Sequence, residues 1–386
     1  MTARPTRARI ARGLAVAAAA AALAGCAWMP SFLGGSGGAL KPAELQPNPN
    51  LQPVRQAWTA RIGRVDFPLT LQPAAGLVVA AAGDGTVAAF DAATGAERWR
   101  GSAGGALSAG VGSDGPLAAV VTRGNELVVL SAGQPAWRQP LGVQSFTAPL
   151  VAGGRVFVLA ADRSIHAFDA ANGRKLWTQQ RPGEALVLRQ AGVLLAVGDT
   201  LVAGQGGRLA GLNPLTGAIR WESGIATSRG TNDVERLVDL VGRTSRVGDS
   251  VCARAFQSAV GCVDTRRGQL AWTRSANGAE GLTGDDRLVV GTEWDGKVIA
   301  WRRDSGERAW THEALLQRGL STPLMLGRTV AIGDAFGYVH LLSREDGSLR
   351  QRLSTDGSAI AAAPVLAGNT LVVVTRNGGV HGFIPE

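Results

Sequence analysis

The sequence repeats one short pattern, in which a glycine is followed four residues later by a tryptophan. Successive tryptophans of this pattern are 38 to 51 residues apart. The copies are Gly95/Trp99, Gly133/Trp137, Gly173/Trp177, Gly217/Trp221, Gly268/Trp272 and Gly306/Trp310. Self-similarity at a period near 40 residues is typical of repeat architectures, so the chain is interpreted as an array of one structural unit.

Each copy reads as short strands joined by tight turns. In the clearest copy, an apolar run at 77–80 and an extended run at 86–90 flank a Gly-Asp-Gly turn at 83–85, which is typical of a β-hairpin. The following Asp-Ala-Ala-Thr-Gly at 91–95 predicts a second turn, because Asp bonds to the backbone ahead of it and Gly adopts a positive φ. With the tryptophan strand and a short opening strand, each copy is predicted to form a four-stranded propeller blade.

The number of blades follows from the hairpin turns. They are expected at 83–85, 123–125, 162–164, 205–207, 257–258, 294–296, 335–337 and 377–379. The eighth copy has no room for a last strand, whereas the segment around Trp58 has a strand but no hairpin of its own. The sequence therefore predicts an all-β, eight-bladed β-propeller of four-stranded antiparallel blades over residues 54–386. The N-terminal strand around Trp58 completes the C-terminal blade and removes the exposed edges of an open array.

The repeated tryptophans admit two interpretations. They form either an aromatic binding surface or the packing between neighbouring blades. A bulky residue that recurs once per blade is explained most simply by packing, and its replacement by alanine is then expected to cost about 3–5 kcal/mol.

Residues 1–25 have the features of a lipoprotein signal peptide. A region with four arginines precedes the short apolar stretch 14–24, which is too short to span a bilayer as a helix. The sequence Leu-Ala-Gly-Cys at 23–26 resembles a bacterial lipobox, which implies cleavage before Cys26 and its lipidation. Ala27 follows the cysteine, and by the same resemblance this residue implies sorting to the outer membrane, on its periplasmic side. Residues 26–53 are rich in Gly and Pro and are expected to be a flexible tether.

The charge argues against nucleic acid as a partner. The formal net charge is +9, with 39 basic and 30 acidic residues. The predicted signal contains four of the arginines and no acid, which leaves a mature chain near +5. No dense run of Lys and Arg interleaved with aromatic residues is present, so we expect no nucleic-acid binding.

Two cysteines remain after Cys26. Cys252 and Cys262 flank the turn at 257–258, so they face each other across one predicted hairpin. In an oxidising compartment they form either a disulfide or two unpaired buried thiols.

The Asp-x-x-x-Gly-x-x-x-Trp pattern also resembles the repeat of quinoprotein dehydrogenases, which hold pyrroloquinoline quinone and calcium on the propeller axis. The resemblance implies adjacent cysteines and long insertions, which this chain lacks, and no carboxylate cluster has calcium-ligand spacing. His166, His340 and His381 occupy equivalent positions in three copies, either as a metal site or as a tolerated strand position. We expect a protein that is not an enzyme and has no cofactor and no metal.

The repeat is broken at 178–195 and 223–247, where the connections between copies are longest. Both connections lead from a tryptophan strand into the next copy, so we expect them side by side on one face of the ring. Each mixes Leu and Val with charges of both signs, which favours a protein-binding patch. The alternative is that both connections are ordinary loops that cover their own blades.

Taken together, the lipobox, the tether and the propeller with these two loops resemble the BamB family of the outer-membrane β-barrel assembly machinery. The resemblance implies a non-catalytic scaffold that binds the periplasmic POTRA domains of the central barrel protein, BamA. It assigns partner contacts to Leu186, Leu188, Arg189 and Asp239, with Val241 where the family often has a second Asp. Arg189 and Asp239 could also pair with each other. Unfolded outer-membrane proteins are a further candidate partner. A propeller that binds peptides or peptidoglycan is the alternative of another class.

Overall fold

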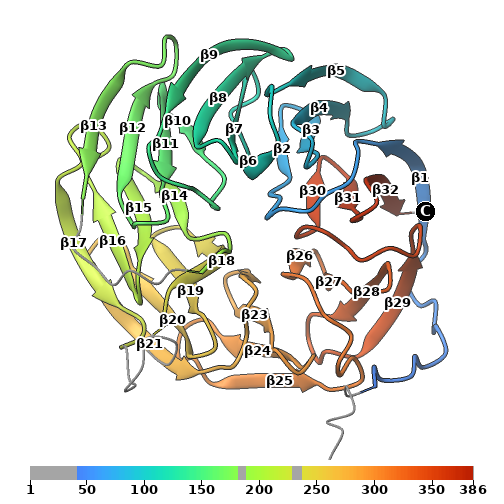
Figure 1. Cartoon of the computed structure of the whole chain (residues 1–386). Coiled ribbons are helices and arrows are strands. Elements are labelled where there is room, and N and C mark those ends of the chain that lie inside the picture. The colour runs from blue at the N-terminus through green and yellow to red at the C-terminus, as the bar shows by residue number, and fades with distance from the viewer. Residues whose placement is uncertain (1–40, 181–187, 228–236, 386) are drawn as a thin grey trace, which may run out of the picture. The chain divides into compact units, whose positions relative to one another are not determined.

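A computed structural model describes residues 41–180, 188–227 and 237–385 of the chain. The chain divides into two compact units, Met1–Lys41 and Pro42–Glu386, and the second forms the architecture below. Its described residues contain 32 strands and no helix, in eight four-stranded antiparallel sheets. The described residues therefore hold no helix that could cross a membrane. Figure 1 shows the sheets arranged as blades around a central axis. The predicted eight-bladed β-propeller is confirmed.

The first four blades follow the chain. Blade 1 contains β2 Gln72–Ala74, β3 Leu77–Ala81, β4 Thr86–Asp91 and β5 Glu97–Ser102. Blade 2 contains β6 Leu107–Ser113, β7 Leu117–Thr122, β8 Glu126–Ser131 and β9 Gln134–Pro140. Blade 3 contains β10 Leu150–Ala152, β11 Arg155–Leu159, β12 Ile165–Asp169 and β13 Lys175–Gln179. Blade 4 contains β14 Leu194–Val197, β15 Thr200–Gln205, β16 Arg208–Leu212 and β17 Ile219–Gly224.

The other four blades continue the series. Blade 5 contains β18 Leu240–Val247, β19 Ser250–Ala255, β20 Ala259–Asp264 and β21 Gln269–Ser275. Blade 6 contains β22 Leu282–Gly284, β23 Leu288–Thr292, β24 Val298–Arg302 and β25 Arg308–His312. Blade 7 contains β26 Leu324–Leu326, β27 Thr329–Gly333, β28 Tyr338–Ser343 and β29 Leu349–Ser354. Blade 8 contains β30 Val365–Ala367, β31 Thr370–Val374, β32 Gly379–Pro385 and β1 Val54–Arg61.

The two ends of the chain close the ring in blade 8. β1 pairs antiparallel with β32, with Val54 opposite Pro385 and Arg61 opposite Gly379, and the two strands lie side by side in Figure 1. Trp58 on β1 is 8% exposed. The predicted closure by the Trp58 strand is confirmed.

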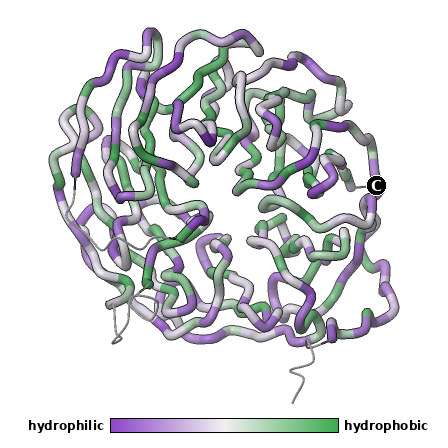
Figure 2. Tube along the Cα trace, in the orientation of Figure 1, coloured by the Kyte–Doolittle hydropathy of each residue, from purple (hydrophilic) through white to green (hydrophobic). Residues whose placement is uncertain are grey.

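The core lies in the middle strands of each blade. In β4 the four central residues are buried and only the two end residues are partly exposed, whereas every residue of the outer strand β5 is exposed or half-buried. Figure 2 shows the same contrast, with polar residues frequent along the outer edge of the ring. Because the strands alternate in direction, the connections between blades emerge on the same face as the turns between second and third strands. We call this the rim face.

Each repeated tryptophan packs its own blade against the next one. In the described residues, five of their indole N–H groups donate to a backbone carbonyl of the following blade at 2.7–3.1 Å. The donors are Trp58, Trp137, Trp177, Trp272 and Trp310. The interpretation of these residues as packing between blades is therefore confirmed.

The repeated glycine is explained by the tryptophan of the preceding blade. Gly306 has a φ of +69°, and a Cβ placed there would lie 2.5 Å from the Trp272 ring. Gly95 stands in the same relation to Trp58, and Gly347 to Trp310. The pattern thus encodes a contact between neighbouring copies as well as a turn within one copy.

The seventh copy carries Gln351 in place of the tryptophan, and the closure of the ring explains why. The next blade is built from β32 and β1, which are the two ends of the chain and are not joined by a turn. No turn glycine therefore faces this position. Gln351 is 5% exposed, and its Nε2 lies 3.5 Å from the Val54 carbonyl oxygen.

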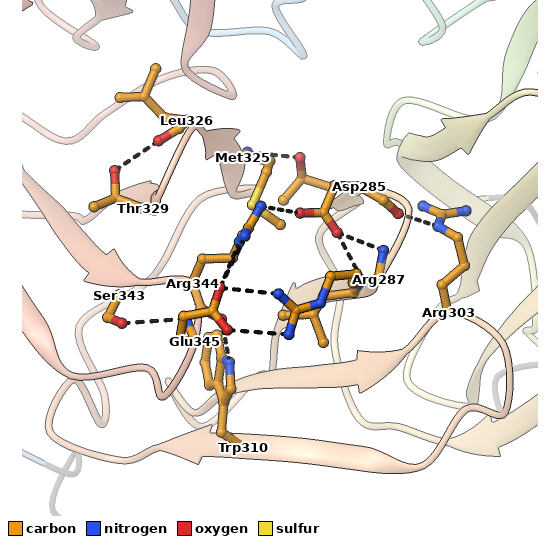
Figure 3. A network of polar contacts seen from close by, with 12 residues as sticks. Asp285, Arg287, Arg303, Trp310, Met325, Leu326, Thr329, Ser343, Arg344 and Glu345 are labelled. Carbon is orange, nitrogen blue, oxygen red and sulfur yellow. Dashed lines mark hydrogen bonds and ion pairs between the residues drawn. The ribbon is translucent and has the colours of Figure 1, made fainter.

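Blades 6 and 7 are also linked by a polar network on the face opposite the rim face (Figure 3). The Asp285 carboxylate accepts hydrogen bonds from Arg344 Nη1 and from the Arg287 backbone amide, both at 2.9 Å. Arg344 and Arg287 also bind the Glu345 carboxylate, and the Arg344 carbonyl accepts the Trp310 indole N–H at 2.8 Å. The tryptophan contact is thus embedded in a network of ion pairs.

Part of the segment predicted as a flexible tether lies along blade 7. The Ala43 amide donates to the Leu316 carbonyl at 2.9 Å. The Asn48 side chain donates to the Arg352 carbonyl at 3.0 Å and accepts from the Arg352 amide at 2.9 Å. The described end of the segment thus follows the outer strand β29, and Cys26 lies outside the described residues.

Candidate functional site

The two long connections meet on the rim face, as the sequence predicts. One follows β13 and the other precedes β18. The Gly242 amide donates to the Ala191 carbonyl at 2.7 Å, and Gly192 forms a bridge with Val241. Of the predicted partner residues, Leu188, Arg189 and Asp239 are described, whereas Leu186 lies outside the described residues.

Asp239 joins the two connections to blade 3. Its Oδ1 accepts from Arg163 Nη2 at 3.0 Å and from Arg163 Nε at 3.2 Å, and its Oδ2 accepts from the Leu188 amide at 3.4 Å. The side chains of Arg163 and Asp239 are each 16% exposed. Two N–H donors of one guanidinium thus fix the carboxylate, and the carboxylate fixes the backbone beside Leu188.

The pairing of Asp239 with Arg189, suggested by the sequence, is replaced by the Arg163 pair. Arg163 occupies the hairpin turn between β11 and β12 with a φ of 66°, which places it beside the connection that ends at Asp239. Arg189 is exposed, and its guanidinium lies 5.6 Å from the centre of the Phe146 ring. Its charge is therefore presented to solvent on an aromatic face.

These residues surround a small notch on the rim face. It has a volume of about 50 Å³, and Phe146, Leu159, Leu188 and Leu240 supply its apolar walls. Arg163 and Asp239 also line it. A shallow apolar notch beside fixed charges suits the side chain of a protein partner better than a small metabolite. We call it the rim notch.

Arg163 and Phe146 also line the rim notch, although the sequence did not indicate either of them as a site residue. Both belong to ordinary parts of the repeat, a hairpin turn and the start of blade 3. The signal that could have found Arg163 is its position in a second-to-third-strand turn, because such turns share a face with the long connections.

Comparisons with known proteins decide the family. The model of the family described as "Outer membrane protein assembly factor BamB" matches residues 83–312. The BamB of Burkholderia pseudomallei is 41% identical over 337 residues, which cover 86% of this chain and 88% of that protein. The chain belongs to the BamB family. The BamB of Bordetella pertussis is 38% identical over 375 residues, or 96% of each chain.

A solved structure of a BamB agrees with this assignment. The BamB of Moraxella catarrhalis superposes with a TM-score of 0.79 at 26% identity, over 86% of this chain and 99% of that one. A quinohemoprotein alcohol dehydrogenase from Comamonas testosteroni matches at 15% identity with a TM-score of 0.65, over 96% and 85%, which shows the fold alone. The interpretation as a BamB-type assembly factor, and not as a dehydrogenase, is confirmed.

The equivalent histidines are framework residues in this BamB-family propeller. His166 contacts Ser164 and Thr178 through its two ring nitrogens, and His340 contacts Asp334 at 3.0 Å. Burial is the main cause that lowers the pKa of His166, His340 and His381. Among the described residues, no group of three or more His, Cys, Asp or Glu could hold a metal ion.

The two cysteines lie opposite each other on β19 and β20. Cys252 and Cys262 are direct cross-strand partners, and the structure records a disulfide between them. Both are buried at 0–1% exposure. Arg303 Nη1 from blade 6 lies 3.3 Å from Cys252 Sγ, so the pair belongs to the packing between blades 5 and 6.

Proposed function

We propose that this protein is a non-catalytic scaffold of the β-barrel assembly machinery, which binds the periplasmic POTRA domains of BamA through the rim notch. Membership of the BamB family supports the assignment to this machinery. The observation that supports the site is that Asp239 binds both Arg163 and the Leu188 amide. This contact fixes the two long connections and a hairpin turn of blade 3 relative to one another. Leu186, Leu188 and Arg189 then supply the contacting side chains.

The chemistry of the notch fits a protein partner. Leu188 lines its wall, and the exposed Arg189 guanidinium stands beside it on Phe146. A few central, well-packed side chains dominate the binding energy of such interfaces, with losses of about 2 kcal/mol or more when one of them is truncated. The arrangement therefore supports an apolar contact at Leu188 and a charged contact at Arg189.

An affinity measurement between the purified protein and the POTRA domains of the partner tests the proposal. Leu188→Ala is expected to weaken binding by about 30-fold, which corresponds to a hot-spot loss of roughly 2 kcal/mol. Arg189→Ala is expected to weaken it less. Leu215→Ala is the matched control, because Leu215 is 60% exposed in a turn on the opposite face. Equal affinities for all three variants and the unaltered protein would contradict the site.

We also propose that lipidated Cys26 anchors the protein in the outer membrane on its periplasmic side. Several acyl chains give firm anchoring, whereas one chain gives only marginal binding. Cys26→Ser is expected to release the protein into the soluble periplasmic fraction, which fractionation with immunodetection measures. Retention of this variant in the outer-membrane fraction would overturn the lipid anchor while leaving the rim notch untouched.

A further inference from the structure

Trp294 differs from every other tryptophan that the structure describes. It is 65% exposed, whereas those of the repeat and Trp301 are buried or half-buried. Within the described residues, no hydrogen bond or ring contact of the Trp294 indole is present. Tryptophan is enriched in protein interfaces and among the side chains that dominate their binding energy. We propose that Trp294 is a second anchor for the protein partner that the rim notch binds, and this inference rests on the proposed function.

The backbone beneath Trp294 is fixed, as an anchor requires. Trp294 lies in the turn between β23 and β24, where the Glu293 amide donates to the Lys297 carbonyl at 2.7 Å. The Trp294 amide donates to the Asn277 carbonyl at 2.8 Å. Glu293 is bound by the fully buried Arg254 at 2.9 Å. A side chain on such a turn loses little backbone entropy on binding.

The surface is continuous from the rim notch to Trp294. Gln190 lines the notch, and its Nε2 donates at 2.5 Å to the carbonyl of Ala279. Ala279 belongs to the same connection as Asn277, which holds the Trp294 turn. Gln190 and Trp294 also line one central cavity of about 1100 Å³. A partner that covers the notch and extends over the mouth of this cavity therefore reaches Trp294.

The rim notch is too small to form a whole protein interface by itself. A stable protein interface covers about 800 Å² on each side, and a notch of about 50 Å³ accommodates only part of one side chain. A domain seated on Leu188 must cover neighbouring rim surface. Trp294 offers an exposed aromatic residue of the kind that dominates binding energy in such interfaces.

The test measures the affinity of the full-length protein for the same periplasmic domains. Trp294→Ala is expected to weaken binding at least tenfold, and Trp294→Phe less, because it keeps an aromatic ring. Ile219→Ala is the matched control, since Ile219 is 44% exposed on the outer strand β17. Unchanged melting temperatures exclude misfolding. Binding should also shift the tryptophan emission to shorter wavelength, and Trp294→Phe should remove most of that shift.

The outcomes separate this inference from the proposed function. If Leu188→Ala weakens binding and Trp294→Ala does not, the second anchor is overturned and the rim notch stands. If neither variant changes the affinity, the proposed function fails and the inference fails with it. If Trp294→Ala abolishes co-sedimentation with peptidoglycan but leaves the protein affinity intact, Trp294 serves a saccharide and the inference is overturned.

Discussion

The contacts between blades and the rim notch are built in different ways. The contacts between blades repeat one arrangement, in which an indole donates to the next blade and covers a glycine such as Gly306. The rim notch occurs once, where Arg163 from a hairpin turn of the repeat binds Asp239 and Asp239 binds the Leu188 amide in the two connections that break the repeat. The repeated residues hold the ring together, whereas the proposed partner contacts lie in the two connections that break the repeat.

Removing a tryptophan between blades gives the largest expected effect. Trp272 is 6% exposed and donates to the Arg303 carbonyl at 2.7 Å. Trp272→Ala should lower the free energy of unfolding by about 3–5 kcal/mol, measured by chemical denaturation. Trp294→Ala is the control, and its stability should stay within about 0.5 kcal/mol because the side chain is exposed. Equal losses for both variants would remove the distinction between the two classes of tryptophan.

A methyl group on the facing glycine should have a smaller effect. In Gly306→Ala the new Cβ would lie 2.5 Å from the Trp272 ring, so overpacking of about 1–3 kcal/mol is expected. Gly248→Ala is the matched control: its φ of +56° is also positive, but nothing lies within 4 Å of a Cβ there. Thermal unfolding of the two variants separates the packing cost from the backbone cost. Similar losses in both would show that the backbone conformation alone requires the glycine.

Introducing a tryptophan at position 351 should not stabilise the protein. Gln351→Trp places an indole where blade 8 has no turn between β32 and β1. The buried position would be overpacked, and a loss of about 1–2 kcal/mol is expected in a denaturation experiment. A gain in stability would show that the tryptophan acts within its own blade, contrary to the contact between blades.

Acid should weaken the ring while leaving the rim notch intact. The pKa of His166, His340 and His381 lies below the ordinary value of 6.5, mainly because of burial. The unfolded chain therefore binds more protons, and stability is lost as the pH falls below 6.5. The melting temperature should decline between pH 7 and pH 5, whereas the described residues that line the notch include no histidine. A constant melting temperature would contradict the assignment of these residues to the framework.

The fold could be predicted from the sequence because its signals are local. The Gly-x-x-x-Trp spacing, the hairpin turns and the surplus strand around Trp58 each lie within a few residues. The turn position of Arg163 indicates its face of the ring, but its pairing with Asp239 and the role of Phe146 could not be predicted. Both depend on which turns and connections of different blades meet on the rim face. The packing of Asn48 on Arg352 was missed for the same reason, since the two residues are far apart in the chain.

The most direct test of the account compares Leu188→Ala with Trp272→Ala in one pair of assays, partner affinity and melting temperature. The account predicts that Leu188→Ala loses about 30-fold in affinity for the POTRA domains at an unchanged melting temperature. It predicts that Trp272→Ala melts lower and, below its transition, binds normally. Unchanged affinity of Leu188→Ala, or an affinity loss that appears only together with a lower melting temperature, would contradict it.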